Sequence, residues 1–233
     1  MNNILQSEVV LAALDSTGRF TDTFWRNDHT FDIPYANGAT LGPGSNTRSH
    51  YAVIEALTKS RPPATPTYVM DSRAALDLTG LGYQLRIADE WLIREESSAQ
   101  LVPVPDNIAA EIIRTRTDLA AFERASVIGF GGEPSDASGH TYSPQLLTDD
   151  RFRFFGLHAD GELAAGVMLF EDPRCIGVYT LFTLPDYRNR GFGTVVLEKA
   201  LRRVPGKPIA TNPSSMSRRI FERLGFRAAG ERS

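Results

Sequence analysis

The sequence has a single cysteine, no long apolar run and little net charge. Cys175, the one cysteine among 233 residues, cannot form an internal disulfide, and no Cys and His residues have zinc spacing. No apolar run approaches the ~18 residues that a membrane span requires. The first residues lack the basic and apolar regions of an export signal. These absences predict a cytoplasmic protein with no metal and no membrane segment.

The small net charge of −3 conceals an asymmetry along the chain. Residues 188–233 carry 11 Lys and Arg against 3 Asp and Glu, a net of +8, and the preceding residues are acidic overall. Basic charge concentrated in this way predicts an anionic ligand near the C-terminus. The acidic remainder would repel a nucleic acid backbone, so we expect a small polyanion and no nucleic acid.

Hydrophobic periodicity and turn residues divide the second half of the chain into strands and helices. A linker with two prolines covers 101–107, and a long Gly- and Ser-rich loop covers 129–144. One helix has Leu119, Phe122 and Ala125 on one face after a cap at Thr117 or Asp118. Another is capped by Ser214 or Ser215 and ended by Gly225. The predicted strands are 111–116, 151–157, 163–170, 175–184 and 208–211, and a further helix covers 195–203.

A glycine-containing loop, Arg188-x-x-Gly191-x-Gly193, joins the strand at 175–184 to the helix that follows. Glycines let the backbone approach a ligand, and a helix N-terminus carries a partial positive charge, so this arrangement predicts phosphate binding. The loop is neither a dinucleotide fingerprint nor a Walker A sequence, because it lacks a third glycine and a Gly-Lys-Ser/Thr end. Tight packing of a glycine turn is the alternative.

Two motifs around this loop resemble one known family. Leu181-Phe-Thr-Leu-Pro-Asp-Tyr-Arg-Asn-Arg-Gly-Phe-Gly-Thr194 resembles the acetyl-CoA signature of the GNAT superfamily of N-acetyltransferases. Arg218-Arg-Ile-Phe-Glu-Arg-Leu-Gly-Phe226 is similar to that family's second motif. The resemblance covers about half the chain and implies the GNAT fold: an α/β architecture with a mixed, mostly antiparallel central sheet flanked by helices.

The resemblance also implies how acetyl-CoA is bound. The backbone of Phe182, Thr183 and Leu184 would pair with the pantetheine arm. The end of the cofactor near the thioester would lie beside Asn212, Ser214 or Ser215. Arg190, Arg218 and Arg219 are candidates for its 3′-phosphate. Backbone N–H groups of the loop would hold the pyrophosphate, those of Arg188, Asn189, Arg190, Gly191, Phe192, Gly193 and Thr194.

The catalytic residues depart from the family pattern. Phe221 stands where many members have a tyrosine that reprotonates the leaving thiolate, so Tyr179 or a serine such as Ser215 is the candidate acid. The strand at 175–184 has no carboxylate or histidine to act as base. Glu133, His140 and Tyr142 in the long loop are candidates, and unassisted attack by an amine held close is the simplest alternative.

The first hundred residues resemble a degenerate copy of the same unit. With a shift of 143 residues, Leu81-Gly-Tyr83 falls on Leu224-Gly-Phe226, and Ser72 falls on Ser215. The phosphate-loop positions become Ser45, Arg48 and His50, so we expect no cofactor site there. Gly38–Ser45 predicts a flexible turn. The copied order predicts helices at Asn46–Ser60 and Ser72–Gly80 and strands at Thr67–Met70 and Gln84–Ile93.

We therefore expect a degenerate GNAT-like domain at 1–105 and a catalytic GNAT domain at 106–233. The last strand of the second sheet is missing, or is supplied by the first copy through 84–93 or by a partner, which leaves a homodimer open. The expected reaction moves an acetyl group from acetyl-CoA to the amine of a small molecule. The alternatives are a CoA-binding regulatory or scaffold protein without turnover and an acetyltransferase acting on a protein or peptide.

Overall fold

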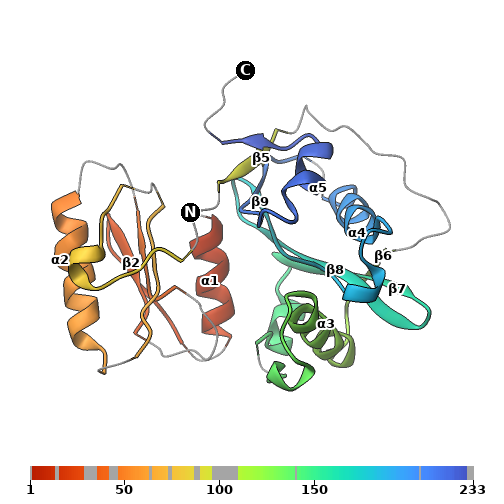
Figure 1. The fold of residues 1–233 in the computed structure, drawn as a ribbon, viewed down its shortest axis with the longest axis horizontal. Helices are drawn as coiled ribbons and strands as arrows, with labels where there is room; N and C mark the ends of the chain where they lie inside the picture. The colour runs from red at the N-terminus through yellow and green to blue at the C-terminus, as the bar shows by residue number, and fades with distance from the viewer. Residues whose placement is uncertain are drawn as a thin grey trace. The chain divides into compact units, whose positions relative to one another are not determined.

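The computed structural model describes residues 2–13, 16–28, 36–41, 47–62, 65–72, 75–86, 90–95, 110–139, 141–204 and 206–229. Apart from the first two residues, the chain forms two compact units, Asn3–Ala88 and Asp89–Ser233 (Figure 1). The expected linker at 101–107 lies outside the described residues, and the domain boundary at 105 stays a prediction. The compact units divide earlier because the strand at 92–94 belongs to the second sheet.

The first unit is a four-stranded sheet with helices. Its strands lie in the order β1-β2-β3-β4, in which β4 is parallel to β3 and the other pairs are antiparallel. The elements are α1 (Asn2–Ala12), β1 (Arg19–Phe20), β2 (Phe24–Arg26), β3 (Gly38–Thr40), α2 (Thr47–Ser60), β4 (Val69–Met70) and the 3₁₀ turn η2 (Thr79–Leu81).

The core of this unit forms around two aromatic residues of β2. Phe24 packs with Ile54 and Leu57, which recur at helical spacing on α2. Trp25 is buried among residues of α1 and β3, and its indole Nε1 donates to the Glu8 carboxylate at 2.7 Å. The alternation along β2 therefore buries both faces of the strand between the helices.

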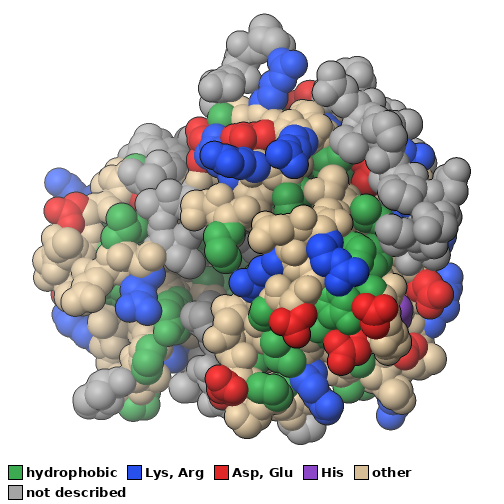
Figure 2. Space-filling view, turned by 45° about the vertical axis from the view of Figure 1, so that its right-hand side comes forward, with side chains coloured by type: hydrophobic (Ala, Val, Ile, Leu, Met, Phe, Trp, Pro, Cys, Tyr) green, Lys and Arg blue, Asp and Glu red, His purple; other side chains and the backbone are tan. Residues whose placement is uncertain are grey.

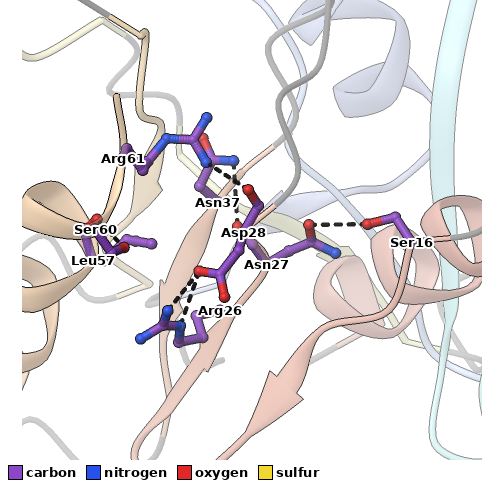
Figure 3. Close-up of polar contacts among 8 residues, drawn as sticks. All are labelled: Ser16, Arg26, Asn27, Asp28, Asn37, Leu57, Ser60 and Arg61. Atoms are coloured by element: carbon purple, nitrogen blue, oxygen red, sulfur yellow. Dashed lines mark hydrogen bonds and ion pairs between the residues drawn. The ribbon is translucent and has the colours of Figure 1, made fainter. Parts of the chain in front are cut away.

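A polar cluster extends the pairing of β2 with β3 beyond the strands (Figure 3). Asn27 N–H donates to the Asn37 carbonyl at 2.8 Å, and the Ser16 hydroxyl donates to Asn27 Oδ1 at 3.1 Å. Arg61, at the end of α2, donates to the carbonyls of Asp28 and Pro66, both at 3.3 Å. The first of these bonds continues the backbone pairing between two buried residues, and the side-chain bonds link the same segment to Ser16 and to the end of α2.

Three expectations for this unit change. The helix at 47–60 is confirmed and the strand at 67–70 is shortened to β4. The helix expected at 72–80 is wrong: the Asp71 carboxylate accepts from the N–H groups of Ala75 and Leu76, which competes with helix formation. The flexible turn expected at 38–45 is also wrong for its first residues, because Gly38–Thr40 form the buried strand β3. Gly38 is needed there for packing, since a Cβ on it would meet the Phe24 ring.

The second unit is a seven-stranded mixed sheet in the order β11-β5-β10-β9-β8-β7-β6, in which only the β9–β10 pair is parallel. This confirms the expected fold class. Its elements are β5 (Leu92–Arg94), β6 (Ala110–Ile112), α3 (Arg116–Gly129), β7 (Phe152–Ala159), β8 (Glu162–Glu171), β9 (Ile176–Thr183), α4 (Phe192–Leu201), β10 (Ile209–Thr211), α5 (Arg218–Arg223) and β11 (Arg227–Ala228), with 3₁₀ turns η4 (Pro134–Asp136), η5 (Pro144–Thr148) and η6 (Pro185–Tyr187).

Helices cover both faces of this sheet (Figure 1). Val167 and Leu169 of β8 pack in one apolar cluster with Val195 and Val196 of α4. On the other face, the ring of Phe122 from α3 packs against Phe154 and Phe182 at centroid distances of 5.3 and 5.2 Å. Alternate residues of the central strands therefore face different helices.

One inner strand of the second sheet comes from the sequence before the expected linker. Leu92–Arg94 pairs antiparallel with both β10 and β11 and fills the place between them. The expectation that residues within 84–93 supply this strand is confirmed for its end, while Gln84–Arg86 form no strand. No partner chain is needed for this position.

Helix starts differ from expectation by a few residues. α3 is capped by Thr115, whose hydroxyl accepts from Asp118 N–H, and not by Thr117 or Asp118. α5 begins at Arg218 after Ser217, without a side-chain cap, while the residues from Ser214 form a preceding turn. The burial of Leu119, Phe122 and Ala125 is confirmed.

Candidate acetyl-CoA site

A bulge interrupts β9 just before its end. The register of β8 with β9 shifts between Gly166 and Met168, whose partners are Phe182 and Tyr179. Thr180, inside the bulge, has φ of 51°. A β-branched residue rarely adopts this conformation, which costs about 1–3 kcal/mol. The strand is therefore held here in a shape that its own residues disfavour.

Beyond the bulge, β9 has an open edge. Pairing of β9 with β10 covers Ile176 and Gly177, and the Thr211 hydroxyl adds a bond of 3.2 Å to the Val178 carbonyl. Leu184 N–H donates to the Ala164 carbonyl of β8, so the backbone groups of Leu181 and Thr183 face away from β8. An extended ligand can pair with this edge as a strand would.

The loop after β9 presents backbone N–H groups at a helix end. The turn η6 is followed by Asn189 and Gly191, both with positive φ, of 60° and 83°. Gly191 is the N-cap residue of α4 and provides no side-chain cap. The first N–H groups of α4, at Phe192, Gly193 and Thr194, have no acceptor within the helix, so they can bind an anion.

The two glycines of this loop have different surroundings. A Cβ on Gly191 would meet no atom within 4 Å, so its surface is open to a ligand. A Cβ on Gly193 would lie 3.0 Å from Thr183 Oγ1 and 3.3 Å from Ile220 Cδ1. Gly191 therefore gives the turn and the approach, while Gly193 lets α4 pack against β9. This cradle fits a pyrophosphate.

The two arginines of the loop are held differently. The Arg188 guanidinium donates to the Gly129 carbonyl at 2.8 Å and to the Thr183 carbonyl at 3.3 Å. It therefore ties the end of α3 to the end of β9. The Arg190 guanidinium lies over the rings of Tyr187 and Phe192, 5.2 and 5.0 Å from their centroids, and this orients a cation beside the loop.

The residues after β10 lie in a turn before α5. The Ser214 carbonyl accepts from the N–H groups of Ser217 and Arg218, and Ser214 Oγ lies 3.3 Å from Ser217 Oγ. Asn212, Ser214 and Ser215 are exposed. The parallel strands end at one edge of the sheet, so this turn and the loop after β9 lie at the same edge.

The two candidate acids, Tyr179 and Ser215, differ in how far their side chains are exposed to solvent. Tyr179 lies opposite Met168, on the face that α3 covers, and burial raises the pKa of its phenol. A raised pKa keeps the phenol protonated at neutral pH but makes it a weaker proton donor. Phe221 is buried in the core, with its ring 5.2 Å from that of Phe226. Ser215 carries an exposed hydroxyl.

The long loop contributes fewer candidates for the base than expected. His140 lies outside the described residues. Glu133 is exposed at the start of η4, where its backbone N–H donates to the Asp136 carboxylate at 2.8 Å. Tyr142 is buried, and burial raises its pKa to about 12.

The basic charge of 188–233 is partly neutralised by ion pairs. Arg218 pairs with Glu90 and Glu222, at 3.0 and 2.6 Å, and Lys207 pairs with Glu171 at 2.7 Å. Arg218 is therefore a weaker phosphate candidate than Arg190. Among the described residues on the face that Figure 2 shows, Lys and Arg side chains lie in several separate groups, and Asp and Glu side chains lie between or beside some of them.

The described ranges lack two kinds of feature. No three His, Cys, Asp or Glu side chains there lie together as a metal site requires. Within the same ranges, no helix combines the length and apolarity needed to cross a bilayer.

Sequence reasoning missed the groups that shape β9. Thr180 has no local signal for a positive φ, since a threonine in an apolar strand predicts regular pairing. Glu123 was not singled out, yet its buried carboxylate accepts from Gly139 N–H at 2.8 Å. Its place in the sequence, next to Phe122 on a helix, gives no indication of that role.

The parallel strand–helix–strand unit has an open strand edge beside an uncapped helix N-terminus, and this arrangement suits an extended, phosphate-bearing ligand. Residues 118–226 match the model of the acetyltransferase (GNAT) family. The matched segment is just under half of the chain, and it is similar to a family whose members use acetyl-CoA.

A curated relative is similar to part of the chain. An uncharacterized N-acetyltransferase from Oceanobacillus iheyensis is 29% identical over 92 residues, which cover 35% of this chain and 56% of that protein. The chain thus spans about half the length of this relative.

The fold of the whole chain recurs in solved structures. A GCN5-related N-acetyltransferase from Kribbella flavida has a TM-score of 0.67 at 16% identity, over 98% of this chain and 92% of that one. A putative GNAT acetyltransferase from Novosphingobium aromaticivorans has a TM-score of 0.56 at 17% identity, over 97% and 90%. Both matches extend over the first unit as well as the second, and at these identities they show the fold alone.

Proposed function

We propose that this protein transfers an acetyl group from acetyl-CoA to the amine of a small molecule. The observation that carries the proposal is the uncapped start of α4 behind Gly191, next to the open edge of β9. The sequence expectation assigned Phe182, Thr183 and Leu184 to the pantetheine arm, but Leu184 N–H donates to β8, so in this proposal the backbone of Leu181 and Thr183 takes that role. Arg188 N–H donates to the Pro185 carbonyl, so the N–H groups from Asn189 to Thr194 are the ones proposed to bind the pyrophosphate.

The chain's own residues supply binding and orientation. Bound acetyl-CoA supplies the activated thioester. The backbone at Leu181 and Thr183 would align the pantetheine arm, and Asn212 and Ser214 would lie beside its end. As the acceptor nitrogen bonds to the acetyl carbon, the carbon–sulfur bond breaks and one amine proton must leave. No carboxylate or histidine lies in β9, so proximity provides most of the rate enhancement in this proposal.

The proton donor for the leaving thiolate is Tyr179, Ser215 or water in this proposal. A CoA thiol leaves readily as a thiolate, so an acid is worth at most about 10²–10⁴ in rate. The buried Phe221 favours the second candidate function, a CoA-binding protein without turnover, because the usual tyrosine is absent. The cytoplasmic location expected from the sequence belongs to this proposal as well.

Calorimetric titration of acetyl-CoA into wild type and Gly191→Glu tests the proposed site. We expect micromolar binding at one site per chain, about −8 kcal/mol, and no measurable binding to the variant. A glutamate at φ 83° would place a carboxylate and its side chain where the pyrophosphate must lie.

Gly82→Glu is the matched control. Gly82 has the same φ of 83° and ψ of 10°, against 0° at Gly191, with no atom within 4 Å of a Cβ. It therefore carries the same backbone strain in the first unit and should leave affinity unchanged. Unchanged affinity in Gly191→Glu would refute the site. Release of CoA with a panel of amines then separates the enzyme from the protein without turnover.

A further inference from the structure

Tyr142 connects the long loop to the bulge in β9. Its hydroxyl lies 2.9 Å from Thr180 Oγ1, where either group can donate. Its ring packs edge-on against Phe122 and Phe154, with centroids 5.8 and 5.5 Å away. The side chain therefore reaches Thr180 from a fixed position in the core.

The backbone of Tyr142 is held as firmly as its ring. The carboxylate of Glu123, buried on α3, accepts from Tyr142 N–H at 3.3 Å and from Gly139 N–H at 2.8 Å. The Ser138 hydroxyl donates to the same carboxylate at 3.3 Å. Glu123 thus fixes the end of the loop, so that the Tyr142 hydroxyl has little freedom to leave Thr180.

Thr180 needs such support. A β-branched residue at φ 51° is kept only where its surroundings determine the conformation. The residues that follow it, Leu181–Thr183, form the edge to which the pantetheine arm is assigned. Relaxation of Thr180 to an ordinary extended conformation would remove the bulge and rotate that edge, since side chains and backbone groups alternate along a strand.

We propose that Tyr142 is a positioning residue: its hydroxyl holds Thr180 in the left-handed conformation and so keeps the Leu181–Thr183 edge presented to acetyl-CoA. This inference rests on the proposed function and adds a residue from outside both sequence motifs. Tyr142 acts through Thr180 and has no contact with the cosubstrate in this proposal.

A double-mutant cycle with Thr180→Gly tests it. Tyr142→Phe keeps the ring and removes the hydrogen bond that holds Thr180 in place. It should weaken acetyl-CoA binding about tenfold, because one hydrogen bond then no longer favours the binding conformation. Glycine adopts positive φ without strain, so Thr180→Gly should stay within about threefold of wild type. Adding Tyr142→Phe to Thr180→Gly should then change nothing further, because the hydroxyl has no conformation left to enforce.

Two further variants complete the design. Thr180→Val removes the same bond from the other side, keeps the β-branch and should lose as much affinity as Tyr142→Phe, which covers the case in which that variant does not fold. Tyr83→Phe is the matched control, since it breaks another Tyr–Thr hydroxyl pair, with Thr58 at 2.8 Å, in the first unit. It should leave affinity unchanged.

The outcomes separate the two proposals. Wild type that does not bind acetyl-CoA overturns the proposed function and this inference with it. Wild type that binds, with Tyr142→Phe unchanged, overturns only the inference. An equal loss from Tyr142→Phe in wild type and in the Thr180→Gly variant also overturns it, because additive effects mean that Tyr142 serves general packing. Loss in wild type and none in the Thr180→Gly variant is the result that supports it.

Discussion

Both units of this protein contain a strand, a helix and a second strand parallel to the first, but among the described residues only the second unit has a first strand whose end is left unpaired with the second. In the first unit β3 and β4 pair through Gly38 with Val69 and Ala39 with Met70. The contact continues beyond the strands: Ser72 Oγ donates to the Thr40 carbonyl at 2.8 Å, and Ser72 N–H to Thr40 Oγ1 at 2.9 Å.

The shift of 143 residues places Gly38–Thr40 on Leu181–Thr183, the open edge of β9. The same positions are thus paired in one unit and unpaired with β10 in the other. The pairing of β2 with β3 runs through three consecutive residues without a register shift, whereas β8 and β9 contain the bulge at Thr180. The two units share the order of these elements and differ at the bulge, so we infer that the bulge, rather than the order of elements, leaves the end of β9 unpaired with β10.

The largest expected effect concerns the strand that the second sheet takes from the earlier sequence. Arg94 of β5 is buried, lies 5.5 Å over the Phe226 ring and donates to the Leu224 carbonyl at 3.3 Å. Burial lowers the pKa of Arg94, and the buried Glu198 opposes that shift. We expect Arg94→Ala to cost about 2–4 kcal/mol, because it removes the bond to the Leu224 carbonyl and a cation that stabilises the buried Glu198.

Urea unfolding with hydrogen exchange measures this loss. Exchange should rise in β5, β10 and β11 and not in β1–β4, which would sharpen the contrast between the two sheets. Arg86→Ala, an exposed arginine before the strand, should cost less than about 0.5 kcal/mol. Equal effects of the two variants would mean that β5 is not anchored through Arg94.

The sequence predicted those elements of the candidate site that local chain geometry determines. Gly191 and Gly193, the end of β9 and α4 follow one another along the chain, so the motif specifies them together. The second sheet lacks a strand in its own sequence, which led to the expectation that residues 84–93 supply one. Only the end of that range lies in β5, because pairing partners more than a hundred residues away leave no local pattern. Tyr142 and Glu123 meet β9 through packing, which periodicity does not encode.

Wrong expectations have the same origin. The helix expected at 72–80 followed from the copied order, yet the Asp71 carboxylate binds the backbone that a helix would use. The caps of α3 and α5 were misplaced because several adjacent Ser, Thr and Asp residues satisfy the same rule. Only the folded chain decides among them.

The second prediction is that the protein loses stability at alkaline pH through Tyr142, whose hydroxyl contacts Thr180 in the bulge of β9. Burial raises the pKa of Tyr142 to about 12, above the ordinary value of ~10 in an unfolded chain. The stability from the neutral phenol is therefore complete below pH 10 and lost as the pH rises through 12. It amounts to about 2–3 kcal/mol.

Urea midpoints of wild type and Tyr142→Phe between pH 8 and 12 measure it. Wild type should lose stability more steeply than the variant above pH 10, because phenylalanine has no proton to lose. Tyr83→Phe should keep the steep wild-type slope. Parallel curves for wild type and Tyr142→Phe would show that the phenol ionises without cost and is not held in the core as described.

The smallest expected effect tests whether the pairing of β3 with β4 is by itself the reason why we expect no cofactor site in the first unit. Ser72→Ala removes the bond to the Thr40 carbonyl and should cost about 1 kcal/mol. Exchange should rise at residues 38–41 and 69–72. Ser60→Ala is the control: it removes another serine hydrogen bond, of 2.7 Å to the Leu57 carbonyl in α2, and should leave the exchange of those amides unchanged.

Acetyl-CoA should still bind to Ser72→Ala at one site per chain. The loop positions of the first unit are Ser45, Arg48 and His50, which cannot adopt the backbone conformation of Gly191 and Gly193. A second binding site in Ser72→Ala would instead mean that the pairing of β3 with β4, and not the lost glycines, separates the two units.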